Sequence, residues 1–492
     1  MRFRAPQKLD ESARGSAQVM DARNFAAPCV QQPAADGVGS EDCLRLNIWK
    51  PVSASSSSKL PVAVYIHGGG FYAGTPQAFP LYDWIAQNST GIVGVSIAYR
   101  MNILGFLSGS AVHADGDFNN GLLDQRAALD WVHRHIAKFG GDPDRVTIIG
   151  ESAGAASVVH QIVAYGGAKG APFQRAVAQS IGYDPMIDSL SPLAEELYKN
   201  FSIAAGCSST QSGGDALACL REASIENVIA GINAVGTGDI APVVDGTFIP
   251  ALPSHLIANG RFSEVDFIGG HCANDGRTFV GGKPSDFVTD ADIVKHVFPR
   301  WPFVTNSTLQ KVFDFYPRAN TSGSPFATEY DRAWTIAQDV LFGCMDQFLA
   351  DALLMKGKKN VFTFRWNTPD PVLLASSPWE DAVGTDTLTG TNSAANAGFT
   401  FTAFNSSETL VSKEAIAYWT SFVSSGDPST GKAPGSPSWQ GFTGSNGSSR
   451  SRIAPTLGDD KVTGTTLERI PEFEVERCAF WMQEWVTAQT KV

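Results

Sequence analysis

The sequence is short of positive charge and lacks the common nucleotide and metal motifs. Its 492 residues include 37 Lys and Arg against 49 Asp and Glu, a net charge of −12 that disfavours nucleic acid as a partner. There is no Gly-rich loop ending in Lys-Ser/Thr, no H-E-x-x-H and no C-x-x-C pair. The sequence therefore implies no nucleotide, no metal and no other cofactor.

Long apolar runs are also absent. No uninterrupted apolar stretch reaches membrane-spanning length, so we expect no transmembrane segment. Hydrophobic residues nevertheless make up 43% of the chain, enough to bury a large core. Because no linker or internal repeat divides the sequence, we expect a single domain over residues 1–492.

Residues 150–154 read Gly-Glu-Ser-Ala-Gly, a G-x-S-x-G pattern centred on Ser152. Residues 145–149 predict a short buried strand, and residues 153–165 predict a helix. Glycines at both ends allow a tight turn between strand and helix that lifts the Ser152 hydroxyl clear of the sheet. The pattern and its context predict a nucleophile elbow, and the alternation of helices and strands predicts an α/β fold.

A second glycine-rich motif lies upstream. Residues 61–66 predict an apolar strand, which runs directly into His67-Gly68-Gly69-Gly70-Phe71. Without side chains, the N–H groups of Gly69 and Gly70 can approach a ligand closely. A glycine triplet alone is more often a turn. Beside the elbow, Gly69, Gly70 and Ala153 are candidate oxyanion-hole donors for ester chemistry.

The chain resembles the type B carboxylesterase/lipase family, which contains the cholinesterases, and most closely its fungal members. The resemblance implies an α/β-hydrolase fold, a large and mostly parallel sheet flanked by helices, with insertions that form a lid and gorge. The segments that carry it follow the order and spacing of the family: 40–44 (SEDCL), 67–71 (HGGGF), 98–100 (AYR), 121–125 (GLLDQ), 139–143 (FGGDP) and 150–155 (GESAGA).

By this resemblance Ser152 is the nucleophile, Gly69, Gly70 and Ala153 are the oxyanion donors, and Asp275 takes the place of the acid. Asp275-Gly276 is also a common turn dipeptide. Its position after the apolar strand expected at residues 265–268 favours the acid role, because catalytic groups collect at the carboxyl ends of strands in open α/β sheets. The implied substrate is an apolar small-molecule ester.

The expected base is missing. All eight histidines lie at or before His296, whereas the family has its catalytic histidine between a Pro-Trp segment and a Gly-Thr-Asn segment. Those segments are residues 378–379 and 390–392 here, which puts the vacant position near Val383. Loss of the histidine lowers the turnover of a serine triad by about a million-fold. We therefore expect no imidazole within hydrogen-bond reach of the Ser152 hydroxyl.

The remaining histidines read as structural. His271 lies four residues before Asp275, where the family often has a structural histidine. His67 belongs to the glycine loop, and we expect it to fix that loop by hydrogen bonds. His133, His135 and His160 lie on predicted helices, and we expect their ring nitrogens to be hydrogen-bonded.

Three explanations of the missing histidine remain open. In the first, the chain is a repurposed enzyme that catalyses a cyclisation or isomerisation of a fungal natural product in the same pocket. In the second, it is a binding-only pseudoenzyme with a macromolecular partner. In the third, the reading frame has lost the histidine segment through a splicing error, which a transcript across residues 375–395 would show.

Cysteines and sequons indicate a secreted ancestor. The resemblance implies disulfides Cys29–Cys43 and Cys207–Cys219, and leaves Cys272, Cys344 and Cys478 as free thiols; the alternative is a cytosolic chain with seven thiols. The chain starts inside the family's N-terminal region, without its first strands or a signal peptide, so we expect it to be secreted if the true start lies upstream and cytoplasmic otherwise. The sequons are Asn88, Asn200, Asn306, Asn320, Asn405 and Asn446.

Overall fold

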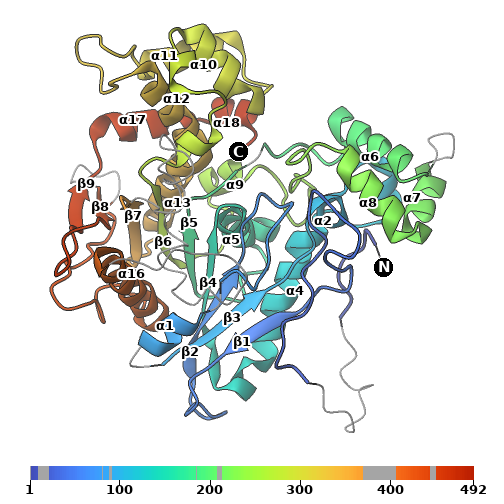
Figure 1. Cartoon of the computed structure of the whole chain (residues 1–492), viewed down its shortest axis with the longest axis horizontal. Coiled ribbons are helices and arrows are strands. Elements are labelled where there is room, and N and C mark those ends of the chain that lie inside the picture. The colour runs from blue at the N-terminus through green and yellow to red at the C-terminus, as the bar shows by residue number, and fades with distance from the viewer. Residues whose placement is uncertain are drawn as a thin grey trace.

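The central feature of the computed structural model is one mixed sheet. The structure describes residues 2–8, 21–79, 81–87, 91–183, 185–207, 213–368, 406–443 and 450–492. In these ranges nine strands pair in the order β1-β3-β2-β4-β5-β6-β7-β8-β9 (Figure 1), parallel from β3 to β8 and antiparallel where β1 and β9 join at the two edges. The strands are β1 (Leu46–Trp49), β2 (Leu60–Ile66), β3 (Val93–Ile97), β4 (Gly141–Glu151), β5 (Arg175–Gln179), β6 (Asp266–Cys272), β7 (Val361–Trp366), β8 (Ser451–Ala454) and β9 (Thr466–Arg469).

Helices connect the strands and extend beyond the sheet. The α-helices are α1 (Tyr82–Gln87), α2 (Asn102–Phe106), α3 (Ser110–Asp115), α4 (Asn120–His135), α5 (Ala153–Val163), α6 (Pro192–Ala204), α7 (Gly213–Glu222), α8 (Ile225–Ala234), α9 (Pro253–Ala258), α10 (Asp290–Val297), α11 (Asn306–Phe315), α12 (Glu329–Gln338), α13 (Cys344–Met355), α16 (Ser406–Ser425), α17 (Glu472–Trp481) and α18 (Glu484–Thr490). Short 3₁₀ turns are η1 (Ile136–Phe139), η2 (Ala164–Gly167), η3 (Asp275–Phe279), η4 (Pro284–Asp286) and η5 (Phe298–Arg300), and η6 (Asp339–Gly343) is a π-helical turn.

The sheet is buried on both faces because its parallel strands are apolar at successive positions. In β2, Val62 and Val64 enter one hydrophobic core, whereas Ala63 and Tyr65 enter the other. Helices α4, α5 and α13 belong to the first core, and α1 and α16 cover the opposite face. Near-continuous apolar strands are what a parallel sheet with helices on both sides requires.

Most predicted elements are confirmed with shifted ends. The strand expected at 145–149 is the end of β4, and the one expected at 265–268 extends to Cys272 as β6. The helix expected at 153–165 is α5, which ends at Val163. Two groups of helices, α6 to α8 and α10 to α12, rise from the sheet on separate sides in Figure 1 and form the insertions that the resemblance implies.

Disulfides confirm two predicted pairs and correct a third prediction. Cys29–Cys43 and Cys207–Cys219 are bonded, so the alternative with seven thiols is wrong. Cys344 and Cys478 were expected to be free thiols but form a disulfide across a sequence separation of 134 residues. Spacing could not reveal that pair because it joins two helices, α13 and α17, that only the tertiary fold brings together. Cys272 stays a buried thiol.

Two further predictions concern membrane-spanning segments and glycosylation sequons. Within the described ranges, no helix combines the length and apolar character needed to cross a bilayer. The sequon residues Asn200, Asn306 and Asn320 are exposed. The other three sequon positions, Asn88, Asn405 and Asn446, lie outside the described residues.

Candidate active site

Ser152 occupies the turn between β4 and α5 in a backbone conformation that non-glycine residues rarely adopt. Its φ is 55° and its ψ is −122°. Backbone hydrogen bonds hold the turn: the Ser152 N–H donates to the Gln179 carbonyl at 3.0 Å, and the Ser152 carbonyl accepts from the Gly182 N–H at 3.2 Å. The segment after β5 therefore fixes the serine, which is half-buried at the end of the sheet.

The glycine loop and the elbow are in direct contact. A Cβ on Gly154 would lie 2.1 Å from the Ile66 carbonyl, so only glycine lets the start of α5 approach the end of β2 this closely. Gly69 has φ of +106°, and a Cβ there would meet the Ala73 carbonyl at 2.3 Å. Because of these approaches, Gly69, Gly70, Ser152 and Ala153 line one cavity.

His67 stabilises the base of the glycine loop. Its Nδ1 lies 2.9 Å from the Gly68 carbonyl, and its ring stacks on Tyr99 with centroids 4.3 Å apart. The Tyr99 hydroxyl in turn donates to the His67 carbonyl at 2.8 Å. Burial lowers the pKa of His67 to about 4, so the ring is neutral at neutral pH and Nδ1–H is the donor. This arrangement confirms the hydrogen-bonding role expected for His67.

The cavity beside Ser152 has a volume of about 750 Å³, and both apolar and polar groups line it. Aromatic side chains from separate elements line it, including Tyr72, Phe106, Phe279 and Phe342. Asp239, His296 and Arg300 also line it. A cavity of this size that combines aromatic walls with several polar groups can hold a small molecule.

Asp275 is buried and is not among the residues that line the cavity. It begins η3, it is 1% exposed, and its Oδ2 accepts from the Ser180 hydroxyl at 2.8 Å and the Cys272 N–H at 2.7 Å. Burial raises its pKa although both hydrogen bonds oppose that shift. Within the described residues, Oδ1 has no hydrogen-bond partner. Asp275 is linked to the elbow through Ser180, which lies between the two residues that bind the Ser152 backbone.

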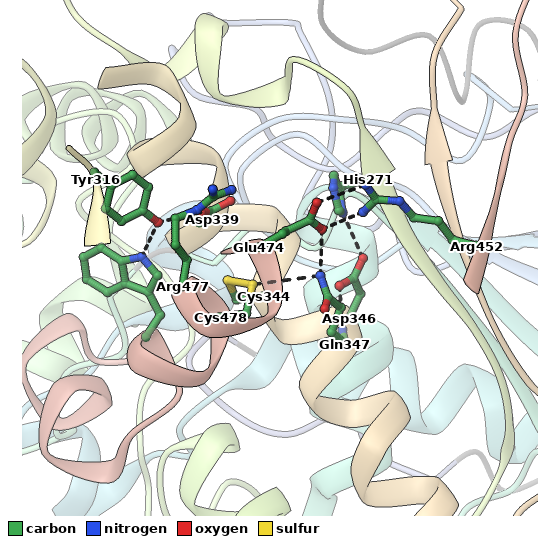
Figure 2. Close-up of a disulfide and its surroundings, with 11 residues drawn as sticks. His271, Tyr316, Asp339, Cys344, Asp346, Gln347, Arg452, Glu474, Arg477 and Cys478 are labelled. Carbon is green, nitrogen blue, oxygen red and sulfur yellow. Dashed lines mark hydrogen bonds and ion pairs between the residues drawn. A yellow bond between two sulfur atoms is a disulfide. The ribbon is translucent and has the colours of Figure 1, made fainter. Parts of the chain in front are cut away.

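His271 is engaged away from the cavity. Its Nδ1 lies 2.9 Å from Asp346 on α13, and both residues are almost fully buried (Figure 2). Burial alone would lower the pKa of His271, but the charge and hydrogen bond of Asp346 raise it above its ordinary value. This is the structural role expected for it.

The remaining histidines give one correction and one new finding. His160 is buried with its Nε2 against the Met186 sulfur at 3.3 Å, but its Nδ1 has no partner among the described residues, so the expectation of a satisfied ring is wrong there. His296 lines the cavity, which sequence reasoning missed because no motif marks it. The vacant histidine position near Val383 lies outside the described residues. Within the described chain, no side chain hydrogen-bonds the Ser152 hydroxyl.

Within the described ranges, no group of three or more His, Cys, Asp or Glu side chains could hold a metal ion. The site combines the strand-to-helix turn that carries Ser152 with a neighbouring glycine loop at the end of a parallel sheet. This combination defines an α/β-hydrolase.

Comparisons with known proteins agree with this class. The Carboxylesterase family model matches residues 1–463, and the chain belongs to that family. It is similar to Lipase 2 of Geotrichum candidum, with 34% identity over 68% of this chain and 63% of that lipase, and to Secreted lipase 4 of Gibberella zeae, with 29% identity over 94% and 82%. The crystal structure of Aspergillus niger EstA superposes with a TM-score of 0.84 at 28% identity, covering 100% of this chain and 92% of EstA. The match spans less than two thirds of the length of Lipase 2.

Proposed function

We propose that this enzyme binds an apolar small-molecule ester in the cavity and attacks its carbonyl with the Ser152 hydroxyl. The N–H groups of Gly69, Gly70 and Ala153 would stabilise the negative oxygen that forms, and Asp275 would be the acid of the site. The observation that carries the proposal is that the Ser152 turn and the glycine loop line one cavity, whose wall also contains aromatic side chains. The relatives named as lipases support an apolar ester as the substrate.

The proposed reaction needs an acceptor for the Ser152 proton, because a neutral alcohol is a poor nucleophile. No histidine follows His296 in the sequence. Three earlier histidines contact other groups: His67 contacts the Gly68 carbonyl, His160 the Met186 sulfur and His271 the Asp346 carboxylate. Without the base, turnover falls by about 10⁶, leaving a rate roughly 10³ to 10⁴ above the uncatalysed reaction. We therefore propose slow hydrolysis by the chain as it stands.

The same absence favours a second candidate, a non-hydrolytic reaction such as a cyclisation or isomerisation of an apolar natural product. Such a reaction needs no acyl-enzyme, but it would use the cavity and the oxyanion donors. In this candidate Ser152 is dispensable, whereas the N–H groups of Gly69 and Gly70 are not.

Labelling with a fluorophosphonate, together with turnover of p-nitrophenyl butanoate, tests the first candidate. We expect Ser152-dependent modification over hours, abolished in Ser152→Ala. Stoichiometric labelling within minutes would show that another group serves as an efficient base. No modification of Ser152 at any time would refute the ester chemistry. An activity on a natural product that survives Ser152→Ala but not Gly70→Val would establish the second candidate.

A further inference from the structure

One wall of the cavity comes from the π-helical turn η6, Asp339–Gly343, which separates α12 from α13. Leu341 and Phe342 from this turn line the cavity and are almost fully buried. The Leu341 carbonyl accepts a hydrogen bond from the Tyr183 N–H at 3.4 Å. Tyr183 follows Gly182, whose N–H binds the Ser152 backbone, so η6 is only a few contacts away from the proposed nucleophile. Single π-turns inside helices often occur at functional sites.

Two consecutive residues of α17 hold the two ends of this turn. Arg477 donates through Nε to Asp339, the first residue of η6, at 2.6 Å. Cys478 is bonded to Cys344, the residue that directly follows η6. Figure 2 shows the residues of both attachments. Four of these side chains, Arg477, Asp339, Cys344 and Cys478, are at most 5% exposed, so neither attachment is a mobile surface contact.

A third attachment lies one helical turn earlier on α17. Glu474 accepts from the Gln347 amide on α13 at 2.9 Å and from Arg452 on β8 at 2.6 Å (Figure 2). These bonds fix α17 against α13 and the sheet independently of η6. The position of η6 is therefore set by a helix that is itself anchored and that supplies no cavity-lining residue in the described chain.

We propose that α17 determines acyl-chain selectivity by clamping η6, which holds Leu341 and Phe342 in the cavity wall. The inference rests on the proposed function, because it concerns the ester that the cavity binds. Each further methylene of a bound acyl chain that packs against an ordered apolar wall makes the binding free energy more favourable. A wall that is free to move makes part of that contact less often, so the gain per methylene is smaller. Arg477 and the Cys344–Cys478 disulfide are thus positioning groups for specificity, in addition to any contribution to stability.

The test is a binding series in the Ser152→Ala protein, where no reaction interferes. The probes are p-nitrophenyl butanoate and p-nitrophenyl octanoate, with dissociation constants from calorimetry. We expect the preference for octanoate over butanoate to fall about tenfold when Cys344→Ser and Cys478→Ser are combined, with little change for butanoate. The matched control is Cys207→Ser with Cys219→Ser, which removes a disulfide that joins neither α17 nor η6 and should leave the preference intact.

Three further variants cover the case in which the disulfide-free protein fails to fold. Arg477→Gln should reduce the preference, and Arg477→Lys should restore part of it, because lysine keeps the charge next to Asp339. Phe342→Ala should reduce the preference for octanoate even though the Arg477–Asp339 bond and the Cys344–Cys478 disulfide are both present. If Phe342→Ala changes the preference but Arg477→Gln and the cysteine variants do not, η6 holds its own shape and the inference is overturned. If neither ester binds the Ser152→Ala protein, the proposed function fails as well.

Discussion

The Ser180 hydroxyl donates to the Asp275 carboxylate at 2.8 Å, and the neighbours of Ser180 bind the Ser152 backbone. The end of β5 and the residues after it therefore contact both Asp275 and the Ser152 backbone. Asp275 is held by Ser180 and the Cys272 N–H on one oxygen only. Within the described chain, these two hydrogen bonds position the Asp275 carboxyl group.

Asp275→Asn should stabilise the protein near pH 8. Burial raises the folded pKa of Asp275, so the native state keeps a proton that the unfolded chain releases above its ordinary value of about 3.9. The stability of the wild type therefore falls as pH rises from there through the folded pKa. Asparagine carries no charge but keeps an oxygen for the two donors, so we expect a gain of at least about 1 kcal/mol at pH 8 that disappears near pH 4.

Thermal unfolding at pH 4, 6 and 8 measures this difference. Asp459→Asn is the control of opposite sign, because backbone hydrogen bonds from Val462 and Lys461 lower the pKa of the exposed Asp459. That variant should gain nothing at pH 8. A wild type more stable than Asp275→Asn at pH 8 would show that the charged form of Asp275 is the one the fold favours.

Gly69→Ala should remove most of the Ser152-dependent turnover while the protein stays folded. An added Cβ would lie 2.3 Å from the Ala73 carbonyl at a φ of +106°, so the loop must shift and its N–H groups with it. Loss of one oxyanion donor typically lowers turnover by about 10² to 10³. Gly238→Ala is the control, since Gly238 lines the same cavity at a φ of +86° with nothing within 4 Å of an added Cβ. Equal loss in both variants would mean that backbone strain, and not donor position, explains the effect.

The sequence predicted the elbow and the glycine loop because both are local. Gly150, Gly154 and the run 68–70 are needed wherever a strand turns sharply beside another backbone, and the apolar strands next to them repeat over a few residues. The family resemblance then extended these local motifs to the whole sheet and to the first two disulfides.

What sequence could not predict depends on contacts between distant segments. The Cys344–Cys478 pair joins α13 to α17, and no spacing rule connects residues so far apart. The π-turn of η6 follows from tertiary packing, because the helical pattern continues through it from α12 to α13. His296 reaches the cavity on an insertion helix, α10, whose position against the sheet no motif encodes.

His296→Gln tests whether the histidine in the cavity wall is a substitute base. Its ring lies against Phe287, with centroids 5.2 Å apart, and beside Gly282. Because no described side chain hydrogen-bonds the Ser152 hydroxyl, we expect the rate of fluorophosphonate labelling to change less than about threefold. The measurement is the labelling rate between pH 5 and 9. A loss of tenfold or more would identify His296 as the group that takes the proton.

Asp346→Asn should destabilise the protein more at low pH than at high pH. In the native protein Asp346 raises the pKa of His271, so the stability that this pair contributes is fully present below about 6.5 and is lost as pH rises through the folded pKa of His271. Arg452 and Glu474 also act on His271, with opposite signs, and both remain in the variant. Removal of one partner of a buried pair typically costs about 3 kcal/mol or more, which we expect at pH 5.5 and not at pH 9.

Urea unfolding at the two pH values gives the free energies for this comparison. Asp351→Asn on the same helix is the control, because the partner of Asp351 at 2.6 Å is an arginine, Arg450, and not a histidine. Its cost should be nearly the same at pH 5.5 and pH 9. If Asp346→Asn likewise costs the same at both, His271 is not protonated in the native state, and the link between α13 and β6 is a neutral hydrogen bond that leaves stability independent of pH.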